Sequence, residues 1–286
     1  MEKYSFLMCL YIKTDTEEFK ISIESILNQT VPCDEIVIVQ DGKITDELQN
    51  AINDYIEKYP GLFKIVVFDQ NKGTGPALNA GVLACKNEII ARLDSDDYTI
   101  PTRMEKVLAK FEEDPELGMV GGNVTEFIGD FKNIVSLVVL PETNEEIITF
   151  AKKRNPFRAS AWNFKKSLCL KAGNFRTYHL VEDYDMFVRM IRAGGKSYNI
   201  QEYLSYMRTG EDFYKRRGGI KYLKSIRKFK KELRTTGFIN MKQYLKTVLP
   251  HDVVCLMPNF LRKFVYQKFL RKKPSQEEID KIQLSE

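Results

Sequence analysis

Long apolar stretches are missing from this sequence. No run within its 286 residues approaches the roughly 18 consecutive apolar positions of a transmembrane helix, so we expect no such helix. The first residues lead directly into a strand-like segment, without an apolar core and a small-residue cleavage site, which argues against a signal peptide. Internal repeats and low-complexity tracts are also absent.

Cysteines are few and scattered, at positions 9, 33, 85, 169 and 255. Their number is odd and none forms a C-x-x-C pair, so neither a disulfide framework nor a zinc site is indicated. Hydrophobic residues make up 43% of the chain and charged residues 29%, the balance of a soluble globular protein. We therefore expect reduced thiols in a cytoplasmic protein.

Positive charge is distributed unevenly. The net charge is +5, yet residues 213–273 hold 18 Lys or Arg against 2 acidic residues, and residues 1–212 are net acidic. A segment this basic attracts phosphate, whether in nucleic acid, an anionic lipid or a phosphorylated substrate.

Strand-like and helix-like segments alternate through the first 125 residues. Apolar runs predict strands over residues 5–12, 35–40, 64–68, 88–93 and 118–124. Helical spacing predicts helices up to residue 28, over 45–59, over 75–85 and from Pro101 onwards. This alternation indicates an α/β fold, a parallel sheet with helices on both faces.

The rhythm changes after residue 125. Strands are expected over residues 131–140 and 157–164, and helices over 144–153 and 182–193. A polar, glycine-containing loop at 206–219 separates this region from the basic C-terminal segment.

Three aspartates follow the predicted strand at 88–93. Asp94, Asp96 and Asp97 repel one another, and such clusters persist where a cation such as Mg²⁺ or Mn²⁺ neutralises them. Ligands of open α/β sheets bind beyond the carboxyl ends of the strands, where these residues should lie. The alternative is a solvent-exposed turn whose aspartates cap a helix.

Two further segments also follow strands. The carboxylate of Asp41, beside Gly42, can accept hydrogen bonds from a nucleobase, although a simple turn explains the pair too. Residues 71–79 open a helix, where glycines allow close backbone approach and Lys72 can meet a phosphate. This loop is neither a P-loop nor G-x-G-x-x-G, which disfavours a dehydrogenase.

Acidic residues also begin the helix predicted at 182–193. The helix dipole alone favours them there, but a carboxylate at this point is also a candidate general base. The spacing does not choose between Glu182, Asp183 and Asp185.

In this order, the segments 5–11, 25–30, 35–42, 71–79, 94–97 and 182–183 resemble the family 2 glycosyltransferases. Residues 11–13, 39–42, 120–122, 181–184 and 216–219 look most like the amylovoran-type branch, which builds bacterial exopolysaccharide and capsule. The resemblance spans nearly the whole chain and ends near Lys273.

The resemblance implies a GT-A fold, with a mixed, mainly parallel sheet flanked by helices and a basic helical C-terminal extension. Residues 1–212 would form the catalytic domain, of which about 1–125 would bind the nucleotide sugar and about 126–212 the acceptor. Residues 213–286 would be basic, amphipathic helices. The implied enzyme is an inverting, metal-dependent glycosyltransferase that uses a nucleotide-diphosphate donor, commonly linked to UDP.

Site residues follow where positions match the family. Tyr11 and Asp41 would contact the base and ribose, with Lys72 and Gly73 nearby. Asp94 would lie close to the ribose, and Asp96 would bind Mn²⁺ or Mg²⁺ beside it. Asp183 would be the catalytic base, next to Glu182.

Other residues after position 150 are weaker candidates. Arg208, Arg216 and Arg217 are candidates for phosphate contact, although surface arginines are the commoner case. Trp162 is either a sugar-stacking platform or an ordinary core aromatic.

Apolar and basic residues interleave between positions 242 and 273, which is typical of helices that lie on an anionic leaflet. The same apolar residues would otherwise pack on the catalytic domain. A lipid-linked saccharide acceptor at the inner face of the cell membrane fits the first case.

Two other functions compete with this interpretation. A sugar-1-phosphate nucleotidyltransferase should have a glycine-rich basic loop after its first strand, where this chain has residues 13–16. A membrane-surface or nucleic-acid binding protein would act through the basic segment alone and leave the aspartates unexplained.

Overall fold

A nine-stranded mixed sheet forms the centre of the protein in this computed structural model, which describes residues 2–210, 215–269 and 273–284. The strand order is β3-β2-β1-β4-β8-β6-β9-β5, and β7 pairs with β6. The strands are β1 (Tyr4–Leu10), β2 (Glu35–Gln40), β3 (Phe63–Val67), β4 (Ile89–Arg92), β5 (Tyr98–Thr99), β6 (Leu117–Phe127), β7 (Ile134–Val138), β8 (Asn163–Lys165) and β9 (Lys196–Arg208).

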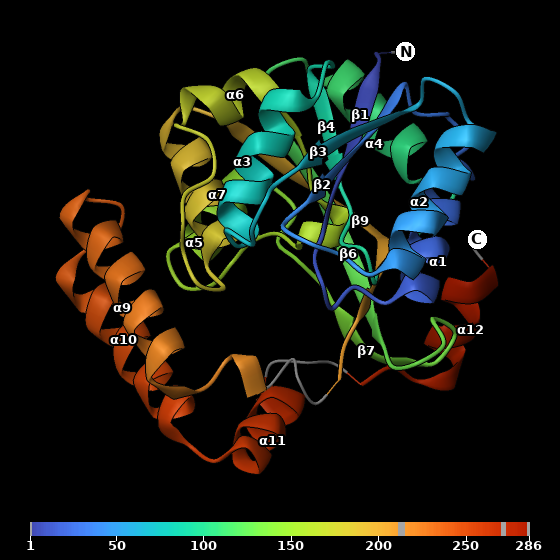
Figure 1. Cartoon of the computed structure of the whole chain (residues 1–286). Helices are drawn as coiled ribbons and strands as arrows, with labels where there is room; N and C mark the ends of the chain where they lie inside the picture. The colour runs from blue at the N-terminus through green and yellow to red at the C-terminus, as the bar shows by residue number, and fades with distance from the viewer. Residues whose placement is uncertain (1, 211–214, 270–272, 285–286) are drawn as a thin grey trace.

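Helices cover both faces of this sheet (Figure 1). They are α1 (Thr16–Leu27), α2 (Asp46–Lys58), α3 (Thr74–Ala84), α4 (Arg103–Glu113), α5 (Asn144–Ala151), α6 (Lys166–Lys171), α7 (Glu182–Arg192), α9 (Gly219–Thr235), α10 (Met241–Leu256), α11 (Asn259–Phe269) and α12 (Gln276–Leu284). A short 3-10 helix, η1, spans Ala159–Ala161.

Alternate residues of β1 enter two different cores, because successive side chains of a strand point to opposite faces. Phe6 packs in one cluster with Phe19 of α1 and Met104 of α4. Leu7 packs in the other with Leu78 of α3. Burial on both sides explains why these strands read as continuous apolar runs in the sequence.

The first four strands are parallel, as predicted, but the rest of the sheet is mixed. β8 runs antiparallel to both β4 and β6, and β7 runs antiparallel to β6. The strand predicted over 157–164 is wrong for most of its length, which is a turn and the helix η1 before β8 begins.

The long strand β9 was not predicted from the sequence. It pairs in parallel with β6 and contains the first residues of what looked like a polar loop at 206–219. The sequence did not indicate a strand here because several of its residues are polar, which is typical of loops. Some of these polar residues are nevertheless buried with hydrogen-bond partners: Asn199 is buried and donates to the Pro141 carbonyl at 2.7 Å.

The C-terminal helices attach to the sheet domain at two places. Helix α9 packs Tyr222, Ile226 and Phe229 against Tyr184 and its neighbours on α7, and α10 packs along α9. Further on, α12 places Ile282 in the same core as α1. No helix in the described part of the chain is long and apolar enough to cross a membrane.

Candidate active site

The carboxyl ends of three neighbouring strands gather residues expected to bind the donor. Tyr11, Asp41 and Asp94 follow β1, β2 and β4, which are parallel neighbours in the sheet. The main chain ties two of these ends together, because the Asp41 amide donates to the Leu10 carbonyl at 2.8 Å. The predicted donor residues therefore share one edge of the sheet, the edge at which ligands of such sheets bind.

The carboxylate of Asp41 holds the loop that precedes α3. Its two oxygens accept hydrogen bonds from the amides of Lys72, at 2.7 Å, and Gly73, at 2.9 Å. The loop comes so close that a Cβ at Gly42 would lie 2.6 Å from the Asn71 nitrogen, and Gly42 also has a φ of +85°. Asp41 thus positions the amino end of α3 at the candidate site.

Asp97 shapes the turn after β4. It is buried, its Oδ1 accepts a hydrogen bond from the Arg208 amide at 2.8 Å, and its carbonyl accepts one from Ser22 at 2.5 Å. Burial raises the pKa of Asp97 well above its usual range, and the charges of Asp96 and Asp94 add to this. These contacts fix the turn. Because its carboxylate is buried and bonded to the main chain, Asp97 is not a candidate to bind a ligand.

Asp94 and Asp96 are only half-buried. Burial, together with the neighbouring Asp94 carboxylate, raises the pKa of Asp96 to about 6. Such crowding of negative charge is relieved by a bound cation.

A divalent ion suits this pair of carboxylates. Within the ranges that the structure describes, no three His, Cys, Asp or Glu residues are grouped so as to hold a metal by themselves. Mg²⁺ needs no such cage, since it is usually bound through one or two carboxylates together with waters and substrate phosphates. Asp94 and Asp96 fit a metal whose coordination a diphosphate completes.

Arg208 braces the aspartate turn from the end of β9. Its Nε lies 3.1 Å from a Glu18 oxygen and donates to the Asp96 carbonyl at 3.1 Å. Its Nη1 donates to the Gly129 carbonyl at 2.6 Å, and the guanidinium lies 4.6 Å from the Phe127 ring centre. The guanidinium of Arg208, which was a candidate for phosphate contact, is thus already bonded to other parts of the protein.

Arg92 is the site residue that the sequence analysis missed. Its side chain, 3% exposed, donates hydrogen bonds to Asp94, at 2.8 Å, and to Asp183. Arg103, itself buried, fixes the Arg92 carbonyl at 2.9 Å. A signal was present, because a charged residue inside an otherwise apolar strand is rarely buried without a partner.

The acidic pair at the start of α7 has two different environments. Asp183 is partly exposed and bound by Arg92. Burial raises its pKa, while Arg92 lowers it. Glu182 is buried, and its Oε2 has no hydrogen-bond partner among the described residues. Burial and the neighbouring Asp183 raise the pKa of Glu182 to about 7.

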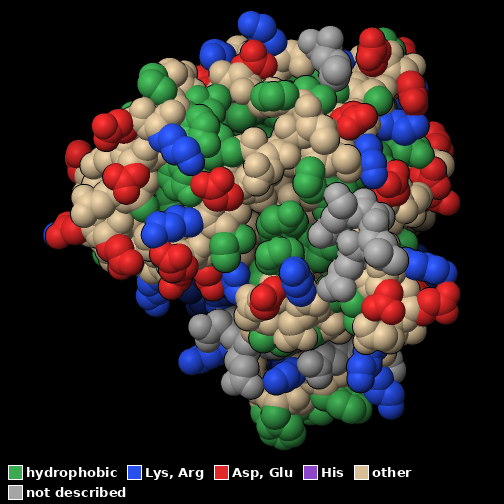
Figure 2. Space-filling view, turned by 90° about the vertical axis from the view of Figure 1, so that its right-hand side faces the viewer, with side chains coloured by type: hydrophobic (Ala, Val, Ile, Leu, Met, Phe, Trp, Pro, Cys, Tyr) green, Lys and Arg blue, Asp and Glu red, His purple; other side chains and the backbone are tan. Residues whose placement is uncertain are grey.

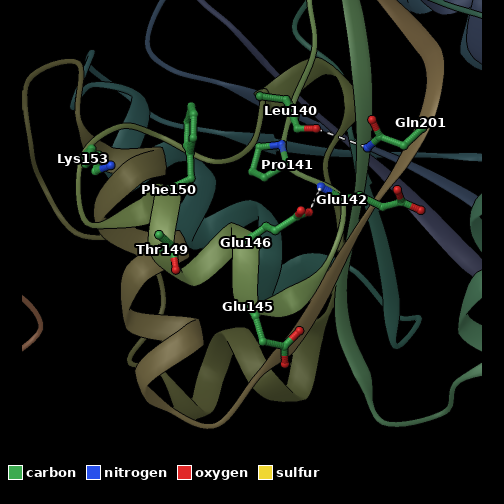
Figure 3. A pocket seen from close by; sticks show the side chains of 9 residues that line it. All are labelled: Leu140, Pro141, Glu142, Glu145, Glu146, Thr149, Phe150, Lys153 and Gln201. Carbon is green, nitrogen blue, oxygen red and sulfur yellow. Dashed lines mark hydrogen bonds between the residues drawn. The ribbon is translucent and has the colours of Figure 1, made fainter.

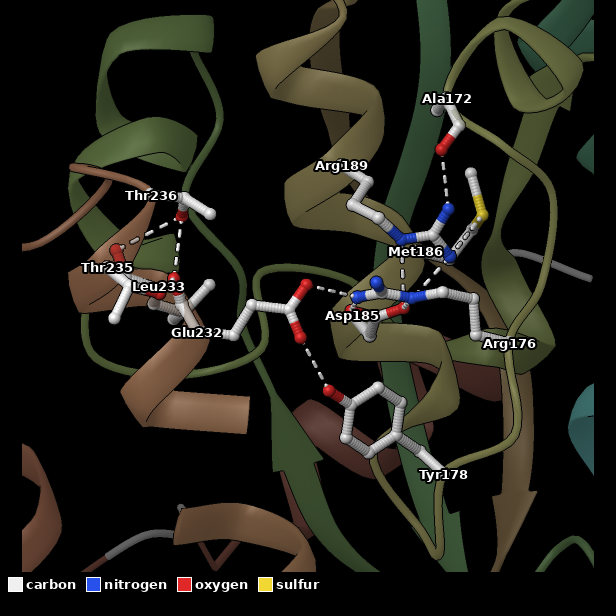
Figure 4. Close-up of polar contacts among 10 residues, drawn as sticks. All are labelled: Ala172, Arg176, Tyr178, Asp185, Met186, Arg189, Glu232, Leu233, Thr235 and Thr236. Carbon is white, nitrogen blue, oxygen red and sulfur yellow. Dashed lines mark hydrogen bonds and ion pairs between the residues drawn. The ribbon is translucent and has the colours of Figure 1, made fainter. Parts of the chain in front are cut away.

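The third carboxylate of this turn, Asp185, has a structural role (Figure 4). It is buried and accepts hydrogen bonds from Arg176 at 3.0 Å and Arg189 at 2.9 Å. Arg176 also bonds Glu232 of α9 at 2.7 Å, and Glu232 accepts from Tyr178 at 2.7 Å. Because the Asp185 carboxylate is fully bonded within this network, it is not a candidate for the base. Glu182 and Asp183 remain as candidates.

Besides Arg208, three cations were expected near the donor phosphates. Lys72 is exposed at the strand edge, Arg216 is exposed and Arg217 is half-buried in the turn before α9. Burial raises the pKa of Tyr222, Arg217 lowers it, and Glu182 acts on the same phenol. Arg217 and Glu182 therefore both act on Tyr222 of α9 through their charges.

Trp162 belongs to the core, so the sugar-stacking interpretation is wrong. It is fully buried, with its ring centre 4.0 Å from that of Phe187 and 4.4 Å from that of Phe164. An aromatic ring enclosed in this way has no face to offer a sugar.

A groove of about 610 Å³ lies away from these residues, between α5 and the strand region around Gln201. Figure 3 shows that Glu142, Glu145 and Glu146 line it together with Phe150 and Lys153. None of the candidate donor or base residues lines it.

Comparison with known proteins gives consistent matches. The family model described as glycosyl transferase family 2 matches residues 5–169. The amylovoran biosynthesis glycosyltransferase AmsE of Erwinia amylovora is 34% identical over 93% of this chain and 98% of its own length. The UDP-Gal:alpha-D-GlcNAc-diphosphoundecaprenol beta-1,3-galactosyltransferase of Escherichia coli is 32% identical over 94% of this chain and 97% of its own.

Among solved structures, the mannosyltransferase PcManGT of Pyrobaculum calidifontis, in complex with GDP-Man and Mn²⁺, superposes with a TM-score of 0.63 at 14% identity. The alignment covers 99% of this chain and 79% of that protein. The likeness confirms the GT-A fold that the sequence predicted.

Proposed function

We propose, from the premise that the chain belongs to glycosyl transferase family 2, that it moves a sugar with inversion from a UDP-linked donor to a saccharide hydroxyl. The observation that carries the proposal is the position of Arg92. Its one guanidinium binds both Asp94, on the donor side, and Asp183, at the start of α7. The carboxylate proposed to bind the donor and the candidate base therefore lie within the reach of a single side chain.

The donor would lie along the carboxyl edge of β1, β2 and β4. Tyr11 and Asp41 would flank the base and ribose, and Lys72 and Gly73 the phosphates, at the amino end of α3, where backbone amides favour anions. Asp94 and Asp96 would hold Mn²⁺ or Mg²⁺, which supplies positive charge to the departing diphosphate. Arg216 and Arg217 would approach the same phosphates from the α9 side.

Asp183 is the proposed base. As the acceptor oxygen attacks the anomeric carbon from the face opposite the diphosphate, its proton passes to the Asp183 carboxylate and the bond to the nucleotide diphosphate breaks. Arg92 lowers the pKa of that carboxylate and so favours its ionised form before the reaction. Glu182 is the weaker choice, because its side chain is buried whereas that of Asp183 is partly exposed and can meet an acceptor.

The proposed acceptor is a lipid-linked saccharide. The Escherichia coli relative is named for a diphosphoundecaprenol acceptor and for UDP-Gal, and we extend that class of acceptor and donor to this chain. The acceptor half would be formed by residues of about 126–212. Such an enzyme would work in the cytoplasm at the inner face of the cell membrane, in exopolysaccharide or capsule assembly.

The test is turnover with a panel of UDP-sugars and Mn²⁺, following release of UDP. Asp183→Asn should lower kcat by about 10²–10⁴-fold, the usual contribution of positioned base catalysis, while UDP still stabilises the variant against heat. Asp54→Asn, on the exposed face of α2, is the control and should keep normal turnover. Near-normal turnover of Asp183→Asn together with an inactive Glu182→Gln would move the base to Glu182.

Metal dependence has its own test. Excess EDTA should abolish UDP release, and adding Mn²⁺ or Mg²⁺ back should restore it. Full activity in EDTA would exclude the metal role of Asp94 and Asp96.

A further inference from the structure

Helix α10 has two apolar faces, and the protein covers only one of them. Cys255 packs in the same cluster as the buried residues of α9, and Val248 is also buried. Asp252, also buried, pairs with Arg227 of α9 at 2.6 Å. These contacts account for how α10 is held, and they leave its other face in solvent.

That other face carries a row of large exposed hydrophobic side chains. We call these residues, together with two on the next helix, the apolar ridge. Their exposure lies between 47% and 76%: Leu245, Leu249, Val253 and Leu256 at helical spacing on α10, and Phe260 and Phe264 on α11 beyond the break at 257–258. Single exposed hydrophobic residues are ordinary on protein surfaces, but a contiguous patch marks an interaction site.

Positive charge lies beside the apolar ridge and on the neighbouring helix. Lys242 and Lys246 are exposed beside it on α10, and Lys224, Lys228 and Lys231 are exposed on α9. Residues 215–269 contain only two acidic side chains, Glu232 and Asp252, and each is paired with an arginine. Figure 2 shows hydrophobic side chains gathered at the lower end of the molecule, where α11 lies in Figure 1, with Lys and Arg around them.

Exposed apolar side chains next to lysines indicate which kind of partner binds here. Nucleic acid would neutralise the positive charge, but its phosphates would not cover aliphatic side chains. A second copy of the chain would cover the ridge, but would bring two strongly basic surfaces together. An anionic bilayer satisfies both features, because its headgroups attract the lysines and its acyl boundary takes up the apolar side chains.

We propose that the apolar ridge lies in the headgroup region of an anionic membrane, with Lys242 and Lys246 at the lipid phosphates. The choice of a membrane rests on the proposed function in one respect, since a lipid-linked acceptor is held there. Helix α9 transmits this attachment to the site: Glu232 bonds Arg176, and Arg176 bonds Asp185, two residues after Asp183. Attachment of the apolar ridge to the membrane therefore fixes how α7 and its acidic pair are oriented relative to the bilayer.

The experiment is co-sedimentation of the full chain with phosphatidylcholine vesicles, with and without phosphatidylglycerol. The wild type should bind only the anionic vesicles, and salt should weaken the binding. The triple variant Leu249→Ser, Val253→Ser, Phe260→Ser should lose at least about tenfold in affinity, because each change removes an apolar group from the bilayer. Lys242→Gln with Lys246→Gln should lose about tenfold or more on anionic vesicles.

A matched control replaces exposed hydrophobic residues elsewhere: Ile21→Ser, Leu83→Ser and Val139→Ser, on α1, on α3 and after β7. It should bind vesicles like the wild type. Equal binding by the ridge variant and this control overturns the proposal, as does light scattering that shows a dimer broken by the ridge changes. The single variants Leu249→Ser and Phe260→Ser serve if the triple variant does not fold.

Stabilisation by UDP and Mn²⁺ separates the two proposals. A ridge variant that keeps this stabilisation but leaves the vesicles supports a membrane role for the ridge alone. A wild type that binds anionic vesicles but gains no stability from UDP refutes the proposed function and leaves the membrane surface standing.

Discussion

Replacing Arg92 with methionine should separate folding from catalysis at this site. Methionine keeps much of the buried volume but removes the charge that Asp183 and Asp94 share. Arg92 is 3% exposed, Asp183 23% and Asp94 47%. Breaking a buried ion pair costs about 3–5 kcal/mol; exposure of the two carboxylates places the cost for Arg92→Met at the low end, about 3 kcal/mol.

The catalytic effect should exceed what lost stability explains. Burial raises the pKa of Asp183 and Arg92 opposes that shift, so without Arg92 the pKa rises further and less of the base is ionised at neutral pH. We expect kcat to fall by about 10²-fold or more near pH 7. Because the remaining activity needs ionised Asp183, it should recover as the pH increases, with its midpoint above that of the wild type.

The assay is UDP release across pH, at a temperature where circular dichroism shows both proteins folded. Arg189→Met is the matched control, since Arg189, with its side chain 12% exposed, also pairs with an aspartate, Asp185, and its hydrogen bonds among the described residues go to Asp185, Ala172 and Met186 rather than to Asp183. It should lose stability but keep the wild-type pH profile. A folded Arg92→Met enzyme with unchanged kcat and pH profile would refute the positioning role.

Three further perturbations test other parts of the structure. Gly42→Ala forces a Cβ toward the Asn71 nitrogen at a φ of +85°, so we expect a loss of about 1–3 kcal/mol in urea unfolding and a higher donor KM; an unchanged KM would mean that the loop does not serve the donor. Asp185→Asn strips two arginines of their carboxylate and should cost about 3 kcal/mol, read from thermal unfolding, whereas a neutral result would show that the network is dispensable. Burial lowers the pKa of Lys230 to about 7, so between there and the ordinary value of about 10.4 the unfolded chain binds a proton that the folded chain does not, and stability rises with pH. Lys230→Met should flatten that rise in Tm; an unaltered slope would place its origin elsewhere.

The sequence predicted those elements whose burial is local and apolar. Strand β2 was placed at its observed bounds because a β-branched run meets Asp41 and Gly42, which stop it. Strand β9 was missed because its register is set by the distant strand β6, which shelters polar residues that sequence patterns assign to loops.

The same difference applies to the candidate site. The carboxylates could be found one by one at strand ends and at a helix start, and the fold brings the strand-end residues to one edge. Arg92 could not be assigned, because its partner Asp183 lies 91 positions away. Asp185 could not be set aside until Arg176 and Arg189 were seen on it.

The network at Asp185 bears on how this chain can be shortened. A protein ending near residue 212 would keep every strand but lose Glu232 from Arg176, and would strip Tyr222, Ile226 and Phe229 from the face of α7. The helix that begins with Glu182 and Asp183 would then show a bare apolar side to water. The basic C-terminal segment thus packs against the sheet domain and supports α7. We therefore expect truncations that remove it to destabilise the rest of the protein. Point substitutions on the outer face of this segment can separate its support of α7 from its proposed attachment to the membrane.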